Sequence, residues 1–175
     1  MTESSEEMGW AGGVYDLLKK ADVRRVSYVP DGGHKALIKF CTDDPAMRTV
    51  SLTTEQDGIG FAAGSWLGGL RSVLLMQSSG VGNCINALSL VRNCQIPFLT
   101  MITMRGDFGE SNNWQIPMGQ GTQPVLEAMG VICLRADRAE DVNDTVAAGI
   151  AMAFSAQQQI AILLGQRLIG AKQFK

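Results

Sequence analysis

Residues 73–88 read VLLMQSSGVGNCINAL, an apolar run of strand formers that ends in a polar, glycine-bearing turn and continues into a helical pattern. The pattern recurs along the chain, because short apolar runs rich in β-branched residues alternate with longer amphipathic stretches. This alternation predicts a three-layer α/β domain with a six-stranded, mostly parallel sheet. Each run looks buried on both faces, as in parallel strands that helices cover. We expect strands over residues 26–29, 50–52, 73–76, 99–102, 132–134 and 161–164.

Stretches with helical periodicity lie between the expected strands. No repeat, linker or low-complexity tract interrupts them, so residues 1–175 are expected to form a single domain. The segment 105–121 is expected to be a long irregular connection, of the kind that is often functional or ordered by a partner. Helices are expected over residues 14–21, 34–40, 55–67, 83–91, 124–129 and 139–156.

The composition is that of a weakly charged globular chain. The 175 residues are 46% hydrophobic and 18% charged, with a formal net charge of −2. These values exclude a disordered acidic chain and a nucleic-acid binder held by bulk charge. A surface short of charge also indicates a face that a partner covers. His34 is the single histidine and no CxxC spacing occurs, which excludes a multi-histidine or CxxC metal site.

The cysteines and the N-terminus suggest where the protein works. Cys41, Cys84, Cys94 and Cys133 lie in apolar or helical stretches, where a free cysteine behaves as a small core residue. The first eight residues are polar and acidic, unlike a secretory signal, and no apolar run approaches the ~20 residues of a membrane span. We therefore expect free thiols and a cytoplasmic location.

The ends of the strands are the most informative part of the sequence. In an open parallel sheet, ligands bind outside the carboxyl ends of the strands. Four consecutive expected strands end in polar turns, most of them with glycine, and these turns hold the candidate site residues. They are residues 30–34, 53–56, 77–83 and 103–107.

Residues 55–69 allow two interpretations. Gly58, Gly60 and Ala63 mimic the dinucleotide-binding fingerprint, but the fingerprint belongs in a strand-to-helix turn and these residues lie inside a helix. Several glycines in one helix instead suit a flat surface that a helix of another subunit approaches closely. Glu55, which opens this helix, is either a carboxylate that stabilises the positive end of the helix or a functional group at a strand end.

The order of these motifs resembles the pyrimidine-binding domain of thiamine-diphosphate enzymes. The shared features are a strand that leads into a Pro-Asp-Gly turn (28–32), then Glu55 with a helix that carries Ala62, Ala63 and Gly64, and then a strand that leads into a Gly-Asn turn (74–83). The segments SSGVGNCINAL (78–88) and MRGDFGE (104–110) are similar to the small α subunits of sulfopyruvate decarboxylase and to phosphonopyruvate decarboxylases. The resemblance covers most of the chain.

The resemblance implies roles for the strand-end residues. Glu55 would hydrogen-bond N1′ of the aminopyrimidine and promote removal of the C2 proton, which calls for a desolvated carboxyl. Ser79, Gly80 and Asn83 would shape the cofactor pocket, although Asn83 can also be a plain helix cap. Gln77 stands where related decarboxylases often carry histidine, and because it cannot shuttle protons we expect it to orient the substrate.

Protonation and substrate binding have their own candidates. His34 would protonate the carbon left by CO2 or bind an anionic group, with a structural role as an equal alternative. Asp31 would assist protonation, or serve only in its turn. Arg105, with Lys35 second, would bind a sulfonate or phosphonate, because arginine pairs well with such oxyanions, or would be a solvated charge.

The resemblance also implies that half of the active site lies in another subunit. Family members bind diphosphate and Mg2+ through Gly-Asp-Gly in a second domain, whereas here Gly106-Asp107 is followed by Phe108. We therefore expect a β subunit with the Gly-Asp-Gly domain, thiamine diphosphate and Mg2+ held mainly by that subunit, and an α/β hetero-oligomer. The expected activity is decarboxylation of 3-sulfopyruvate to sulfoacetaldehyde. The alternatives are phosphonopyruvate decarboxylation, two-component carboligation, and a non-catalytic nucleotide-binding or scaffold subunit.

Overall fold

The computed structural model describes residues 5–170, with side chains from residue 9 onward, and contains one six-stranded sheet. The strand order is β2-β1-β3-β4-β6-β5, and all five strand pairings are parallel, so the sheet is wholly rather than mostly parallel. All six expected strands are present. They are β1 (Val23–Tyr28), β2 (Arg48–Ser51), β3 (Arg71–Gln77), β4 (Phe98–Thr103), β5 (Ile132–Ala136) and β6 (Gln159–Leu164).

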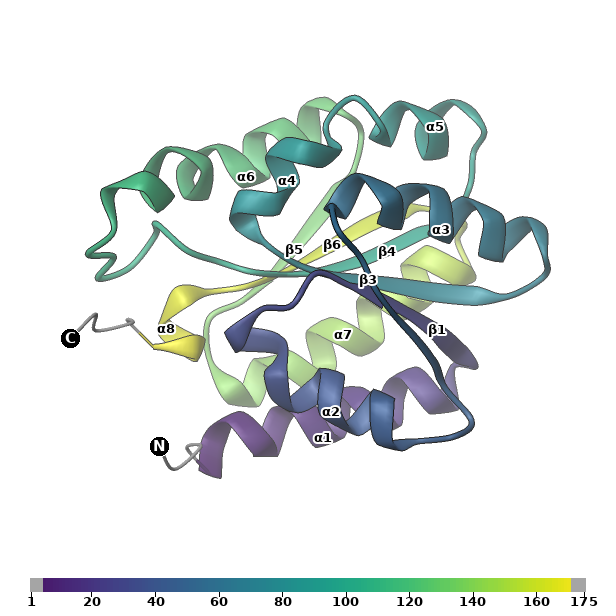
Figure 1. Ribbon diagram of the computed structural model, residues 1–175, viewed down its shortest axis with the longest axis horizontal. Helices are drawn as coiled ribbons and strands as arrows, with labels where there is room; N and C mark the ends of the chain where they lie inside the picture. The colour runs from purple at the N-terminus through teal and green to yellow at the C-terminus, as the bar shows by residue number, and fades with distance from the viewer. Residues whose placement is uncertain (1–4, 171–175) are drawn as a thin grey trace.

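Helices cover both faces of the sheet, which gives the expected three layers (Figure 1). One face carries α1 (Ser5–Lys20), α2 (Lys35–Asp43) and α7 (Ala139–Phe154), and the other carries α3 (Glu55–Leu67), α4 (Ser78–Cys84), α5 (Leu88–Asn93) and α6 (Ile116–Ala128). Two short 3-10 helices, η1 (Gly32–His34) and η2 (Asn113–Gln115), and the C-terminal α8 (Gln166–Ile169) lie near the carboxyl ends of the strands.

The hydrophobic core is divided by the sheet into two clusters. One packs Val14, Leu18 and Val146 of α1 and α7 against the sheet, and the other packs Ile59 and Leu126 of α3 and α6 against its opposite face. Burying each such side chain contributes roughly 1.5–3 kcal/mol. Strands β4 and β6 are buried along their whole length, as expected, but β2 and β5 are partly exposed because they form the two edges.

Several element boundaries differ from the expected ones. The expected helix over 83–91 is instead the pair α4 and α5, and the helix expected over 124–129 is only the last part of α6. The irregular connection is therefore shorter than 105–121, since η2 and α6 occupy its second half. Among residues 5–170, no helix combines the length and the hydrophobicity that a bilayer crossing needs.

The cysteines follow the expectation in part. All four are free thiols. Cys41 and Cys84 are buried core residues, and burial raises the pKa of each thiol to about 12. Cys133 is half-buried, with its pKa raised to about 11 by burial, and Cys94 is exposed rather than part of the core.

Candidate active site at the carboxyl edge of the sheet

The first turn of α4 joins the candidate residues, because it follows β3 directly at the carboxyl edge of the sheet (Figure 1). The Ser78 hydroxyl accepts a hydrogen bond of 3.0 Å from the Arg105 backbone N–H. The Ser79 hydroxyl donates to the Gln77 side-chain oxygen at 2.9 Å. Gly80 lies against the Glu55 side chain. This short helix therefore brings together residues from three separate strand ends.

Glu55 opens α3, and its side chain turns inward, with only 8% of the residue exposed. Asn83 donates a hydrogen bond of 2.9 Å from Nδ2 to Glu55 Oε2. A Cβ on residue 80 would stand 2.3 Å from Glu55 Oε1, so only glycine lets α4 approach the carboxylate this closely. Glu55 Oε1 has no hydrogen-bond partner within residues 5–170. One oxygen is thus fixed and the other is available.

Asp31 is the centre of a second polar cluster, at the ends of β1, β3 and β4. Its Oδ2 accepts from the Thr103 hydroxyl at 2.5 Å and from the Gly33 N–H at 3.1 Å, and its Oδ1 accepts from Gln77 Nε2 at 3.0 Å. Burial acts to raise the pKa of Asp31, but the charge of His34 and these hydrogen bonds outweigh it and hold the pKa below its usual value. Asp31 is therefore a well-anchored carboxylate.

His34 is fully buried at the start of α2, with Nε2 at 3.1 Å from the Met101 carbonyl oxygen. Burial lowers the pKa of His34, and the opposing effects of the Asp31 charge and the nearby carbonyls do not offset it. A side chain without exposed surface favours the structural alternative. Its role as a proton donor stays a prediction.

Arg105 is not a solvated charge, because it forms a buried ion pair. Its Nε and Nη2 donate to the two carboxylate oxygens of Glu110, both at 2.7 Å, and the two side chains are 7% and 2% exposed. Gly106, with φ +74°, reverses the chain so that Glu110 folds back onto Arg105. The hydrogen bonds from Arg105 hold the pKa of Glu110 down to about 2 despite burial.

A cavity of about 150 Å3 lies between the Asp31 turn and α8. Arg105 and Asp31 line it together with Thr103 and Ile169. Lys35 is exposed and lines a different cavity of about 420 Å3, which shares only Asp31 and Gly32 with the first. The structure thus brings Asp31, Gln77 and Arg105 to one edge and separates Lys35 from Arg105.

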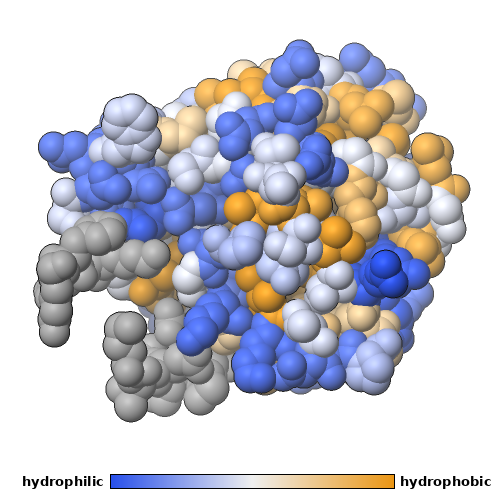
Figure 2. Space-filling model, in the orientation of Figure 1, coloured by the Kyte–Doolittle hydropathy of each residue, from blue (hydrophilic) through white to orange (hydrophobic). Residues whose placement is uncertain are grey.

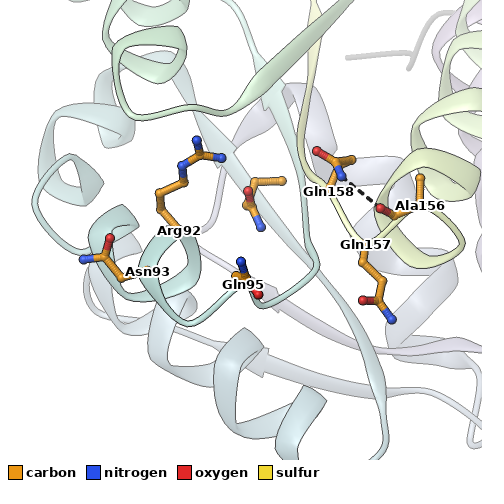
Figure 3. A pocket seen from close by; sticks show the side chains of 7 residues that line it. Arg92, Asn93, Gln95, Ala156, Gln157 and Gln158 are labelled. Carbon is orange, nitrogen blue, oxygen red and sulfur yellow. Dashed lines mark hydrogen bonds between the residues drawn. The ribbon is translucent and has the colours of Figure 1, made fainter.

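A larger cavity, of about 510 Å3, lies elsewhere (Figure 3). Its lining is polar, with Arg92, Gln95, Gln157 and Gln158 among its residues. These residues precede β4 and β6, so the cavity sits at the amino ends of the strands. Ligands of open parallel sheets collect at the opposite, carboxyl ends. Its size alone therefore does not make it the site.

Sequence reasoning missed four residues of this edge. Thr103 follows the strand expected over 99–102 and begins a polar turn, so its position carried a usable signal. Ser78 lies in a similar turn. Glu110 and Gln166 carried none, because their partners depend on how the loop after β4 folds back and on where α8 docks.

The residues around Glu55 are suited to the aminopyrimidine of thiamine diphosphate. A carboxylate oxygen without a partner can share a proton with a ring nitrogen, and the second oxygen is already held by Asn83. The absence of a side chain at Gly80 leaves room for the carboxylate beside α4. The donor set of this edge therefore fits that end of the cofactor.

The wholly parallel sheet between two helical layers is the fold of the pyrimidine-binding domains of thiamine-diphosphate enzymes. The same fold occurs in benzoylformate decarboxylase from Polynucleobacter necessarius, with a TM-score of 0.71 and 18% identity over 95% of this chain and 31% of that chain. No family model matches the chain.

The particular family follows from the sequence relatives: the chain belongs to the sulfopyruvate decarboxylase α subunits. It is 35% identical over 152 residues to sulfopyruvate decarboxylase subunit alpha of Methanococcus maripaludis, a match that covers 86% of this chain and 91% of the relative. Phosphonopyruvate decarboxylase of Streptomyces viridochromogenes is 37% identical over 107 residues, which are 60% of this chain and 27% of that protein. The resemblance seen in the sequence is confirmed.

Proposed function

We propose that this chain is the pyrimidine-binding α subunit of a two-component decarboxylase that converts 3-sulfopyruvate to sulfoacetaldehyde and CO2. The observation that carries the proposal is the buried Glu55 carboxylate, with one oxygen fixed by Asn83 and the other available, in a chain of the sulfopyruvate decarboxylase α-subunit family. The C1–C2 bond of the substrate breaks, CO2 leaves, and a proton is added at C2.

Bound thiamine diphosphate supplies the carbon nucleophile and electron sink for this reaction. Glu55 holds the proton shared with N1′ of the aminopyrimidine, and Asn83 keeps the carboxyl group in place. Gly80 forms the wall beside that carboxyl, and Ser79 contributes the polar edge of the pocket. These assignments rest on the contacts of α4 with Glu55 and with Gln77.

The 2-oxo acid would bind at the Asp31 cluster. Gln77 orients it, because its amide already bridges Asp31 and Ser79. Arg105 lines the adjacent cavity and receives the sulfonate. Asp31, which lines this cavity, and the fully buried His34 are the two candidates for delivering the proton to C2. Lys35, in its separate cavity, is the second candidate for an anionic group.

A partner subunit completes the site in this proposal. It carries the Gly-Asp-Gly domain and holds Mg2+ and the diphosphate, while residues 1–175 form the pyrimidine domain alone. The α3 face suits such a contact, since Gly60 and Gly64 have open space beside them and Leu67 is 81% exposed. Figure 2 shows hydrophobic surface over this helix. The complex would be a cytoplasmic hetero-oligomer.

The test is reconstitution. The chain is mixed with its cognate β subunit, thiamine diphosphate and Mg2+, and CO2 and aldehyde are measured with 3-sulfopyruvate, phosphonopyruvate and pyruvate. We expect the highest kcat/KM with 3-sulfopyruvate. A preference for phosphonopyruvate, or a ligation product in place of aldehyde, would replace the substrate or the reaction proposed.

The non-catalytic alternative is tested on the chain alone. Calorimetric titration with NAD should show no binding, since the glycines of the fingerprint-like segment lie within α3 rather than in a strand-to-helix turn. Tight NAD binding without a partner would favour a nucleotide-binding subunit.

A further inference from the structure

Gln166, the first residue of α8, makes contacts that the proposed function does not use. It is fully buried although it is polar and close to the end of the described chain. Its Oε1 accepts hydrogen bonds from the backbone N–H groups of Asp107 and Phe108, both at 3.1 Å. Its Nε2 donates to Glu110 Oε2 at 3.0 Å. One side chain therefore ties α8 to the loop after β4 at three points.

The Glu110 carboxylate accepts hydrogen bonds both from this loop and from α8. Its two oxygens accept from Arg105 at 2.7 Å each, from Gln166 at 3.0 Å and from the Asn112 N–H at 3.0 Å. A buried carboxylate with so many donors has a fixed orientation. Arg105, paired with it side-on, is fixed as well.

The side-on pair leaves one edge of the Arg105 guanidinium open. A guanidinium has five N–H donors. Glu110 occupies Nε and one N–H of Nη2, so three N–H groups, two of them on Nη1, have no partner within residues 5–170. Arg105 lines the cavity of about 150 Å3 beside the Asp31 turn. The N–H groups that Glu110 leaves free are suitable donors for an oxyanion bound in that cavity.

The far wall of this cavity comes from α8 as well, because Ile169 lines it. Gln166 and Ile169 lie on the same short helix, so the position of α8 sets both the wall and the loop that carries Arg105.

We propose that Gln166 is a positioning residue for the distal anionic group of the substrate: it fixes Glu110, and through Glu110 it aims the open edge of Arg105 into the cavity. The proposal rests on the proposed function for the identity of the substrate. Gln166 does not contact the reacting atoms, so its loss should weaken recognition of the sulfonate and leave the chemical step unchanged.

The variants are Gln166→Met, which keeps the length of the side chain, and Gln166→Glu, which keeps the acceptor for the loop but loses the donor to Glu110. The matched control is Gln159→Met. Gln159 is the first residue of β6, the strand that leads to α8; it is also buried, and its Nε2 donates to the Ile96 carbonyl oxygen at 2.9 Å. In the reconstituted complex, both Gln166 variants should raise KM for 3-sulfopyruvate about tenfold with kcat within about twofold, and Gln159→Met should change neither.

A second readout does not depend on turnover. In the 15N spectrum of the full chain, the Arg105 Nε–H signal, assigned with Arg105→Lys, should shift on titration with sulfoacetate. Gln166→Met should move that signal in the free protein and weaken sulfoacetate binding about tenfold, whereas Gln159→Met should do neither. This arm decides the inference even if the complex releases no CO2, an outcome that would refute the proposed function alone.

Unchanged sulfoacetate binding in both Gln166 variants would overturn the positioning role. Equal losses in the Gln159 control would also overturn it, because they would assign the effect to general loosening of β6.

Discussion

Gly80→Ala isolates the contact between α4 and Glu55. The added methyl group would stand 2.3 Å from Glu55 Oε1 and 2.4 Å from Cδ. Ordinary contact between heavy atoms needs roughly 3.5 Å, so the carboxylate must move by about 1 Å. A displacement of this size near the reacting atoms costs about 100-fold in rate. We therefore expect kcat of the Gly80→Ala complex to fall about 100-fold.

Stability should change much less than activity. Alanine in place of glycine favours a helix by up to about 1 kcal/mol, and loss of the Asn83 hydrogen bond costs about the same. The free energy of unfolding, measured with urea, should therefore stay within about 1 kcal/mol of wild type. The assay is CO2 release from 3-sulfopyruvate by the reconstituted complex.

The control lies in the same helix. A methyl group at residue 82 meets only the Met118 sulfur, at 3.3 Å, which is the flexible part of a side chain. Gly82→Ala should keep near wild-type activity. If Gly80→Ala keeps more than half of the wild-type rate, the position of the Glu55 carboxylate does not control the reaction.

Three further outcomes test other parts of the structure. With a thiol reagent at about pH 8, Cys94 should react fast and the other thiols slowly, because burial raises their pKa; several fast thiols would mean a looser core. The pKa of Glu110 is held at about 2 instead of its ordinary 4.5, so its ion pair with Arg105 stabilises the fold above about pH 4.5, and this contribution is lost as the pH falls toward 2. Glu110→Gln should flatten that part of the curve of unfolding free energy against pH. An unchanged curve would show that the ion pair does not contribute to stability in this pH range. Leu67→Lys should weaken assembly with the β subunit in sedimentation and leave the thermal midpoint of the free chain unchanged, since Leu67 is 81% exposed; unaltered assembly would move the contact away from α3.

The sheet could be predicted from the sequence because strand and helix periods alternate clearly. Each apolar run became a strand, and the helix over 55–67 was predicted with its observed bounds. Exposure of β2 and β5 could not be predicted, since a run of apolar letters does not say which strands lie at the edges. The order of the strands decides that.

Glycine in one case and proline in the other account for the two misjudged helices. Gly80 and Gly82 argue for a turn by intrinsic propensity, yet α4 forms there because the glycines let it pack against Glu55 and Met118. In α6, Pro117 occupies the first turn and suits it, while Pro124 looked like the start of a helix that in fact begins at Ile116.

The candidate site could likewise be predicted only in part from the sequence. Glu55, Asp31 and Gln77 could be predicted because each stands at or next to a strand end, where parallel sheets bind ligands. The Arg105–Glu110 pair spans five residues and fits no helical or strand spacing, and Gln166 lies 56 residues from the carboxylate it binds. Such contacts depend on tertiary docking, which local patterns do not encode.

The role of Glu55 is tested most directly by a comparison of two carboxylates in the first turn of α3. Glu55 is buried beside Gly80, and Asp57 is exposed, with the Thr53 hydroxyl at 3.4 Å from its carboxylate. CO2 release from 3-sulfopyruvate is measured in complexes that carry Glu55→Gln or Asp57→Asn. Glu55→Gln should abolish activity with the complex still assembled, and Asp57→Asn should retain it. Full activity of the Glu55→Gln complex would show that the Glu55 carboxylate is not needed for the reaction.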